Sequence, residues 1–360
     1  MQKNLILRHM NGKEKIDLVF VVLTPFHYKA YLSHYKEAMN NKNVLILKEG
    51  YIDITNWHND QAIIIDIPKE KFSIHDLRRD FIDKIKTYRR LIRKLKLVCS
   101  NLIEQYNLND SFTLNIGSDR DIFTQILINK IYEKRKNKTT SLIAFEEGLG
   151  FYDTKNFLET LKRFFFPIVS PVLLGEKLHF YKPMGQERHI KEVYCRFPDL
   201  IPKNGFSVYR QLLVRENSID GVYDSKSTKA LVFSFPNSAI NISEEDKIEW
   251  LSFVYEKLNI KEFVIKLHPS EEEYSKNLIK PNYNWTFLEG QHPIDKLNYF
   301  DYKYIVNFSS SIIMDVLSSN YPKKKILTIG LFDKLSIASI YEQTHYINVN
   351  SLLNETEIRL

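Results

Sequence analysis

The segment Ile16-Asp-Leu-Val-Phe-Val-Val-Leu23 is an almost continuous run of apolar, largely β-branched residues, and Thr24-Pro25 ends it. Such a run is typical of a strand that is buried on both faces, as in a parallel sheet covered by helices. Further strand and helix patterns alternate after it. We therefore predict repeated βαβ units and a doubly wound α/β fold.

The alternation continues through the first half of the chain. Strands are predicted at residues 43–48, 62–66, 112–116 and 140–145. Helices are predicted at residues 26–40, at 73–105 with Ser73 and Asp76 as a capping box, and at 119–135. Residues 151–202 are less regular and rich in aromatic side chains, and we expect them to form an excursion from the sheet.

A second set of strands and helices follows a lapse in hydrophobic periodicity at residues 215–229, which is typical of a linker. Strands are predicted at 230–235, 262–267, 304–308 and 325–329, with helices opened by Ser243 and at 311–319. We predict two Rossmann-like domains, residues 1–222 and 223–360. Two such domains facing a cleft describe the GT-B architecture of many nucleotide-sugar glycosyltransferases.

The composition is that of a soluble globular protein, with 44% hydrophobic and 26% charged residues among 360. The amino-terminal residues lack the pattern of a signal peptide, and no stretch approaches the ~18 apolar residues that span a bilayer. Cys99 and Cys195 have no metal-type spacing. We expect a cytoplasmic protein.

The net charge of +7 predicts attraction to an anionic partner. Much of this charge lies in residues 78–96, within one predicted helix. This helix is either an ordinary solvated face, a groove for an anionic acceptor, or a face for peripheral contact with the cytoplasmic side of the inner membrane. No nucleic-acid-binding motif accompanies it, so nucleic acid is not an expected partner.

Two adjacent acids and a glycine, Glu146-Glu147-Gly148, follow the predicted strand at 140–145. Ligands of open parallel sheets bind outside the carboxyl ends of the strands. The pleat of a strand sends Glu146 and Glu147 to opposite sides, so one can act as a general base while the other braces the loop. Gly148 permits close approach of a ligand to the backbone. The alternative is a pair of solvated turn glutamates.

Two further predicted strands end in polar groups suited to an anionic ligand. Lys266-Leu-His268-Pro269 ends one of them, and an imidazolium at His268 can bind a phosphate and supply a proton. The run from Ser309 to Ser311 ends the other, where hydroxyls and free helix amides can cradle a phosphate or carboxylate. The alternatives are a packing histidine and ordinary serine helix caps.

A possible metal signature, Asp119-Arg-Asp121, matches the DxD pattern that binds a metal-diphosphate pair in another glycosyltransferase architecture. Because it opens a predicted helix, the two acids are accounted for as first-turn residues that favour the helix dipole. We expect no obligatory metal and no cofactor.

The three strand ends together resemble the signatures of bacterial sialyltransferases, and they are most similar to the capsular polysialyltransferase family. The runs that carry the resemblance are Phe145-Glu-Glu-Gly-Leu-Gly-Phe-Tyr152, Ile265-Lys-Leu-His-Pro-Ser-Glu271 and Val306-Asn-Phe-Ser-Ser-Ser311. Two residues depart from the family pattern: Leu149 stands where a small polar residue is common, and Leu267 replaces a proline.

The resemblance implies a metal-independent, inverting GT-B enzyme that uses CMP-sialic acid. It implies Glu147 as the general base, with Glu146 as its structural partner or as the alternate base. It implies that His268 binds the CMP phosphate and acts as the acid. The remaining implied donor-binding residues are Gly148, Lys266, Pro269, Ser309, Ser310 and Ser311.

The implied partners are CMP-sialic acid and an anionic glycan acceptor, such as capsular polysialic acid or lipooligosaccharide. A different enzyme class stays open, because CDP-polyol phosphotransferases of the teichoic-acid polymerase kind also have a His-Pro and a strand-end serine pair followed by Asp. The corresponding run here is Ser310-Ser311-Ile-Ile-Met-Asp315. A non-catalytic capsule-assembly protein is the third alternative.

Overall fold

The computed structural model describes residues 15–35, 42–50, 52, 54, 62–67, 81–108, 111–133, 140–146, 151–152, 157–179, 184–201, 203, 205–212, 222–234, 243–268, 271, 279–288, 297–308, 312–330, 343–352 and 358. The chain divides into two compact units. The first comprises Met1–Phe151 and Lys155–Val214, and the second comprises Tyr152–Thr154 and Arg215–Leu360. The domain boundary at residue 222 stays a prediction.

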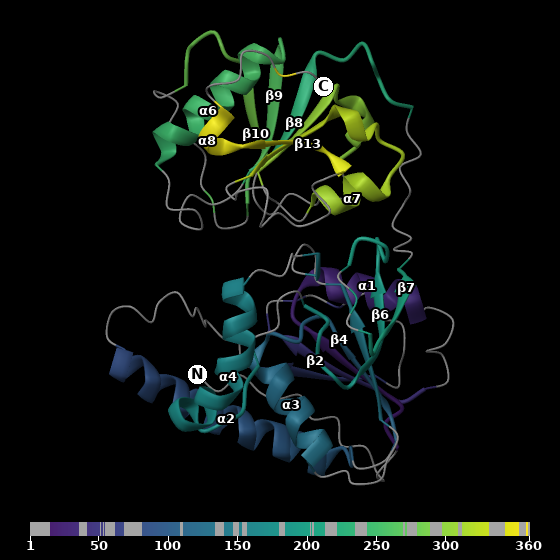
Figure 1. The fold of residues 1–360 in the computed structure, drawn as a ribbon. Helices are drawn as coiled ribbons and strands as arrows, with labels where there is room; N and C mark the ends of the chain where they lie inside the picture. The colour runs from purple at the N-terminus through teal and green to yellow at the C-terminus, as the bar shows by residue number, and fades with distance from the viewer. Residues whose placement is uncertain are drawn as a thin grey trace. The chain divides into compact units, whose positions relative to one another are not determined.

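The first unit is built on a parallel sheet (Figure 1). Among its described residues, seven strands follow the order β3-β2-β1-β4-β5-β6-β7, and every neighbouring pair is parallel. The strands are β1 Leu18–Val22, β2 Val44–Glu49, β3 Ala62–Ile67, β4 Thr113–Ile116, β5 Ser141–Phe145, β6 Ile190–Cys195 and β7 Val208–Gln211. The apolar run at Ile16–Leu23 thus supplies an inner strand, and all five residues of β1 are buried.

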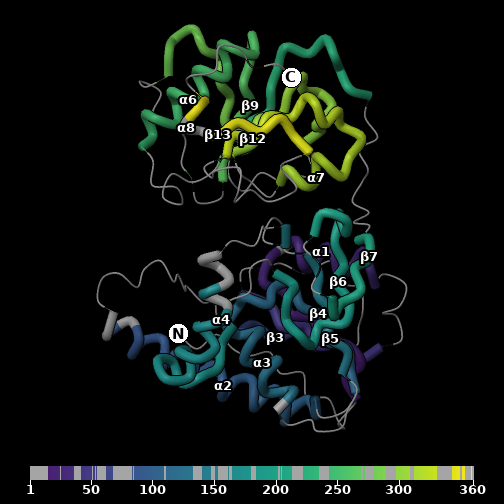
Figure 2. The backbone as a smooth tube through the Cα atoms, viewed as in Figure 1, coloured from purple at the N-terminus to yellow at the C-terminus, as the bar shows by residue number. Residues whose placement is uncertain are grey.

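Four described helices accompany this sheet, and three of them lie together. They are α1 Pro25–Tyr35, α2 Phe81–Gln105, α3 Ile122–Glu133 and α4 Phe157–Leu174. Helix α2 packs against both α3 and α4, as the course of the chain in Figure 2 also shows. Residues 36–40 and 73–80, which belong to two predicted helices, lie outside the described residues.

The second unit repeats the design with six described parallel strands in the order β10-β9-β8-β11-β12-β13. Its strands are β8 Lys229–Phe233, β9 Glu262–Lys266, β10 Trp285–Leu288, β11 Tyr304–Asn307, β12 Ile326–Gly330 and β13 His345–Asn348. Its described α-helices are α6 Glu244–Lys257, α7 Ile313–Ser318 and α8 Val349–Leu352.

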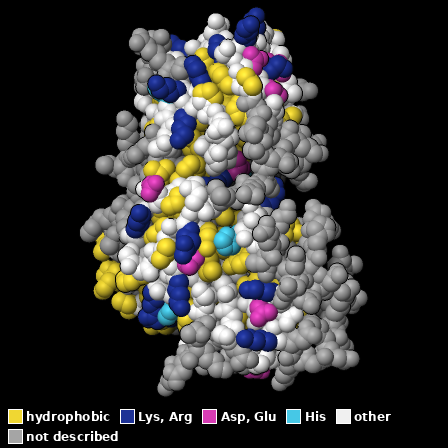
Figure 3. Space-filling model, turned by 90° about the vertical axis from the view of Figure 1, so that its right-hand side faces the viewer, with side chains coloured by type: hydrophobic (Ala, Val, Ile, Leu, Met, Phe, Trp, Pro, Cys, Tyr) yellow, Lys and Arg dark blue, Asp and Glu magenta, His cyan; other side chains and the backbone are white. Residues whose placement is uncertain are grey.

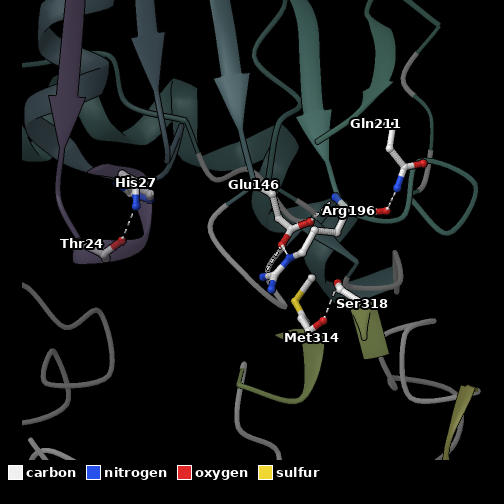
Figure 4. Close-up of polar contacts among 7 residues, drawn as sticks. All are labelled: Thr24, His27, Glu146, Arg196, Gln211, Met314 and Ser318. Carbon is white, nitrogen blue, oxygen red and sulfur yellow. Dashed lines mark hydrogen bonds and ion pairs between the residues drawn. The ribbon is translucent and has the colours of Figure 1, made fainter. Parts of the chain in front are cut away.

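The helix ends of this unit follow local rules. Ser243, which the sequence places at the start of this helix, forms a capping box with Asp246 at the start of α6, and each side chain bonds the other's backbone amide. At the end of α7, the Ser318 hydroxyl donates to the carbonyl of Met314 at 2.7 Å (Figure 4). Such a bond, from a serine hydroxyl to the carbonyl four residues earlier, is the usual local contact of a serine inside a helix.

Both sheets have the Rossmann strand order, in which the third, second and first strands are followed by the fourth and later ones. The direction of strand addition reverses between β1 and β4 in the first unit, and between β8 and β11 in the second. The prediction of two doubly wound, Rossmann-like units is confirmed.

The prediction that residues 151–202 leave the sheet is wrong. This segment contains α4 and then β6, and β6 pairs in parallel with β5. Two features conceal the pattern: Pro167 and Pro171 lie inside α4, where proline usually ends a helix, and β6 alternates buried and more exposed residues. The short strands β7, β10 and β13 were likewise not predicted, because most of their residues are exposed or half-buried and form no buried apolar run.

Candidate active site

Glu146 lies at the carboxyl end of β5 and is completely buried. Its backbone amide continues the sheet by donating to the Tyr194 carbonyl at 2.9 Å. Its carboxylate binds Arg196, which follows β6: Oε1 accepts from the guanidinium at 2.6 Å, and Oε2 accepts from the Arg196 backbone amide at 2.7 Å. Figure 4 shows these contacts. The side chain of Glu146 therefore joins the ends of two neighbouring strands.

Arg196 also contacts residues from α1 and β7. Its guanidinium carbon lies 4.6 Å from the ring centre of Phe26, which belongs to α1. Its carbonyl accepts a bond of 2.7 Å from the Gln211 amide at the end of β7 (Figure 4). Both oxygens of Glu146 are therefore engaged by Arg196, and the roles predicted for the two glutamates stay predictions. Glu147 and Gly148 lie outside the described residues.

At the end of β9, the turn that carries His268 contacts a carboxylate for which the sequence predicts no role. This carboxylate belongs to Glu271, and its Oε2 accepts from the His268 backbone amide at 3.0 Å. In return, the amide of Glu271 donates to the His268 carbonyl at 2.9 Å. These two bonds fix the backbone of His268 relative to Glu271. Pro269, a predicted site residue, lies outside the described residues.

Glu271 also connects this turn to two other elements. Its Oε1 accepts from the Ser234 hydroxyl, which follows β8, at 2.9 Å, and it pairs with the ammonium of Lys247 from α6. The side chain of Lys247 is 0% exposed. An unpaired charge at that depth would cost several kcal/mol, about 3–5 when one partner of such a pair is removed, so the pair fixes the position of Glu271.

Burial and charge oppose each other at His268. Burial lowers the pKa of the His268 imidazole, the Glu271 carboxylate raises it, and Lys266 and Lys247 lower it. Burial also lowers the pKa of Lys266, whose ammonium donates to the Leu267 carbonyl at 3.0 Å. Burial lowers the pKa of Lys247, and the Glu271 carboxylate offsets part of that effect. Two basic groups, Lys266 and His268, thus lie at one strand end beside the Lys247–Glu271 ion pair, and this strand end can take an anionic ligand.

The remaining predicted site residues, Ser309 to Ser311, lie outside the described residues. They stand between the end of β11 at Asn307 and the start of α7 at Ile313. Their predicted contact with phosphate or carboxylate stays a prediction.

The acids of the DxD pattern have separate structural contacts. Asp121 Oδ1 accepts from the Thr124 amide at 2.8 Å and so caps α3. Asp119 Oδ2 accepts from the amides of Gln186 and Glu187 at 2.7 and 3.0 Å. Burial raises the pKa of Asp119 to about 6, against the effect of these bonds. Among the described residues there is no cluster of three or more His, Cys, Asp or Glu side chains that could hold a metal.

Three residues that hold the site together were not predicted: Arg196, Lys247 and Glu271. For Lys247 a signal exists, because it shares the buried face of α6 with Leu251 and Val254 at helical spacing. A lysine on an apolar face needs a buried acidic partner. For Arg196 the signal is hidden, since its partner Glu146 is 50 residues away in sequence.

Comparisons with known proteins identify the fold. No family model matches the chain, and no curated protein matches its sequence. Among solved structures, it is similar to UDP-GlcNAc 2-epimerase from Neisseria meningitidis bound to UDP-GlcNAc, with 12% identity and a TM-score of 0.51 over 94% of this chain and 90% of that one.

Two further solved structures show similar agreement. The α/β-galactoside α-2,3-sialyltransferase of Photobacterium phosphoreum has 12% identity and a TM-score of 0.50 over 95% of this chain and 96% of that one. Os79 from O. sativa, in complex with UDP, has 12% identity and a TM-score of 0.52 over 93% and 84%. The chain therefore has the GT-B glycosyltransferase fold. At this identity the similarity establishes the fold and not the reaction.

The pair of Glu146 and Arg196 can be tested by a double-mutant cycle. We expect R196M to destabilise the first unit by about 3–5 kcal/mol, because it leaves a buried carboxylate without its cation. The double variant E146Q/R196M should cost less than the sum of the single changes. Hydrogen exchange of the β5 and β6 amides, followed by mass spectrometry, measures the effect within this unit alone.

The exposed pair of Glu192 and Arg210, which joins β6 to β7 at 3.0 Å, provides the matched control for that cycle. R210M should leave the exchange rates of the same amides nearly unchanged, because an exposed pair contributes little. Equal effects of R196M and R210M would contradict a structural role for the buried pair.

The balance of charges at His268 predicts opposite pKa changes for two variants. E271Q removes the group that raises the pKa of His268, so the imidazole should lose its proton at lower pH than in the unmodified protein. K247M removes a group that lowers that pKa, so the loss should occur at higher pH. NMR titration of the His268 ring with selectively labelled histidine measures both, and shifts of the same sign would refute the assignment.

Proposed function

We propose that the chain is an inverting, metal-independent sialyltransferase that moves sialic acid from CMP-Neu5Ac to a hydroxyl of a bacterial surface glycan. Capsular polysialic acid and lipooligosaccharide are the acceptor classes that the sequence resemblance favours. The GT-B fold supports a glycosyltransferase as the broader class, and a sialyltransferase is among the structures it matches. The choice of CMP-sialic acid rests on the three strand-end motifs.

The observation that carries the proposal is the basic cluster of Lys266 and His268 at the carboxyl end of β9, beside the ion pair of Lys247 and Glu271. β8, the strand beside β9, borders the point where strand order reverses, and open α/β sheets bind ligands at such points. The Ser234 hydroxyl at the end of β8 is tied to the same Glu271 carboxylate. A nucleotide phosphate supplies the negative charge that this cluster favours.

The electrostatics at His268 suit a proton donor that becomes competent when the donor substrate binds. Burial lowers the pKa of His268 in the free protein. A phosphate next to the ring would raise that pKa, because an anion favours the imidazolium. His268 would then give its proton to the phosphate oxygen that leaves with CMP.

In the acceptor half of the reaction, we assign the general base to Glu147. Its neighbour Glu146 is committed to Arg196, which supports a bracing role for Glu146 and leaves the adjacent acid as the base. Glu147 removes the proton of the acceptor hydroxyl, and the oxygen forms a bond to the anomeric carbon of sialic acid. The bond from that carbon to the phosphate oxygen breaks, so a single displacement inverts the configuration.

The test is release of CMP from CMP-Neu5Ac in the presence of a sialylated oligosaccharide and EDTA. Transfer under these conditions supports the proposal. Parallel assays use CDP-glycerol and UDP-sugars as donors. Turnover of CDP-glycerol alone would assign the chain to the polyol-phosphate transferases. No turnover of any donor together with no CMP binding would leave a non-catalytic role.

Two substitutions separate the assigned roles. E147Q should lower the rate of transfer at least about a hundredfold, which is the usual contribution of a general base, and it should retain CMP binding. H268A should lower both transfer and CMP affinity. H345A and E104Q change an exposed histidine and an exposed glutamate and should behave as the unmodified protein. Full transfer activity of E147Q would overturn the assignment of the base.

A further inference from the structure

Helix α4 presents a row of large apolar side chains to solvent. The exposed fractions of Phe164, Ile168 and Val172 are 67%, 60% and 73%, and these residues follow one another every fourth position. Phe165 and Val169 form a second exposed row beside them, and Leu161 precedes both. Ser170 and Leu174, on the other side of the helix, are buried. We refer to the six exposed residues as the α4 surface.

The end of α4 is fastened to α2 by basic side chains. Arg89 donates to the carbonyls of Leu173 and Val172 at 2.8 and 2.7 Å. Lys96 donates to the Gly175 carbonyl at 2.8 Å and pairs with the Glu176 carboxylate at 2.5 Å. These contacts place the basic helix α2 beside the α4 surface, and the two helices are neighbours in Figures 1 and 2.

Helix α2 carries further cations that are not used in this fastening. Arg90, Arg93 and Lys94 are exposed, and the apolar Leu97 is 61% exposed on the same helix. On the face in Figure 3, Lys and Arg side chains are scattered among apolar and uncharged ones. On α2 and α4, exposed cations and exposed apolar rows lie on neighbouring helices.

We propose that the α4 surface and the cations of α2 dock the protein onto an anionic lipid bilayer. Contiguous exposed apolar side chains of this size mark an interaction surface. A helix with aromatic and aliphatic residues on its outer face inserts at the boundary of headgroups and acyl chains, and neighbouring Arg and Lys side chains bind anionic headgroups. Charge complementarity favours this occupant over a second copy, which would bring the same cations together.

This inference does not depend on the donor substrate, and it refines the sequence-based hypothesis about residues 78–96. The sequence-based hypothesis of membrane contact rests only on the positive charge of this helix. Arg89 now has a structural contact with α4, so it is excluded from the test. The apolar rows of α4 supply the component that charge alone lacks.

The experiment measures co-sedimentation of the full chain with phosphatidylcholine vesicles, with and without one third phosphatidylglycerol. The unmodified protein should bind the anionic vesicles and release as salt rises. F164S/I168S should weaken binding about tenfold or more, through lost apolar burial. R90E/R93E should weaken it by a similar factor, since each basic residue near the surface contributes about 1 kcal/mol.

Matched controls change the same residue types away from the α4 surface. F206S/V222S replaces two exposed apolar residues, and K226E/K324E reverses two exposed cations. Both should bind anionic vesicles as the unmodified protein does. The proposal is overturned if the unmodified protein does not bind, or if the α2 and α4 variants bind as well as the controls. A dimer that F164S/I168S dissociates, without lipid binding, would assign the surface to a second copy.

Discussion

Each of the two sheets has a buried ion pair near the carboxyl end of one of its inner strands, and this pair positions the polar side chains found there. In the second unit the pair joins Lys247 to Glu271, and in the first it joins Arg196 to Glu146. In both units the carboxylate also accepts a hydrogen bond from a backbone amide: Glu271 from that of His268, and Glu146 from that of Arg196. A charge removed from water is tolerated only when its partners are fixed in place. The pairs therefore fix the positions of Glu146, Arg196 and His268 at the strand ends.

The consequence for chemistry differs between the units. In the second unit, Glu271 orients the turn that carries His268 and at the same time moderates the loss of basicity that burial imposes on the imidazole. In the first unit, the pair engages both carboxylate oxygens of Glu146. The proposed assignment of the general base to Glu147 rests on this engagement of Glu146.

Much of the fold could be predicted from the sequence because parallel strands buried on both faces are continuous apolar runs, as β1 illustrates. β6 escaped prediction because its residues alternate in burial, and α4 because two prolines interrupt its pattern. At the site, His268 and Glu146 were predicted as strand-end residues, because the end of a buried strand is visible in the sequence as the point where an apolar run gives way to polar residues. Arg196, which binds Glu146, was not predicted, and neither was the pair of Lys247 and Glu271 that supports His268. The two ion pairs span 50 and 24 residues, so they depend on tertiary structure.

The central claim is that the end of β9 binds the phosphate of a cytidine nucleotide. Titration of the protein with CMP, observed through the NMR signals of the His268 ring, tests it directly. The account predicts that CMP shifts these signals and raises the pKa of His268, while an equal concentration of cytidine does neither. If CMP binds with the His268 signals and pKa unchanged, or does not bind at all, the account is contradicted.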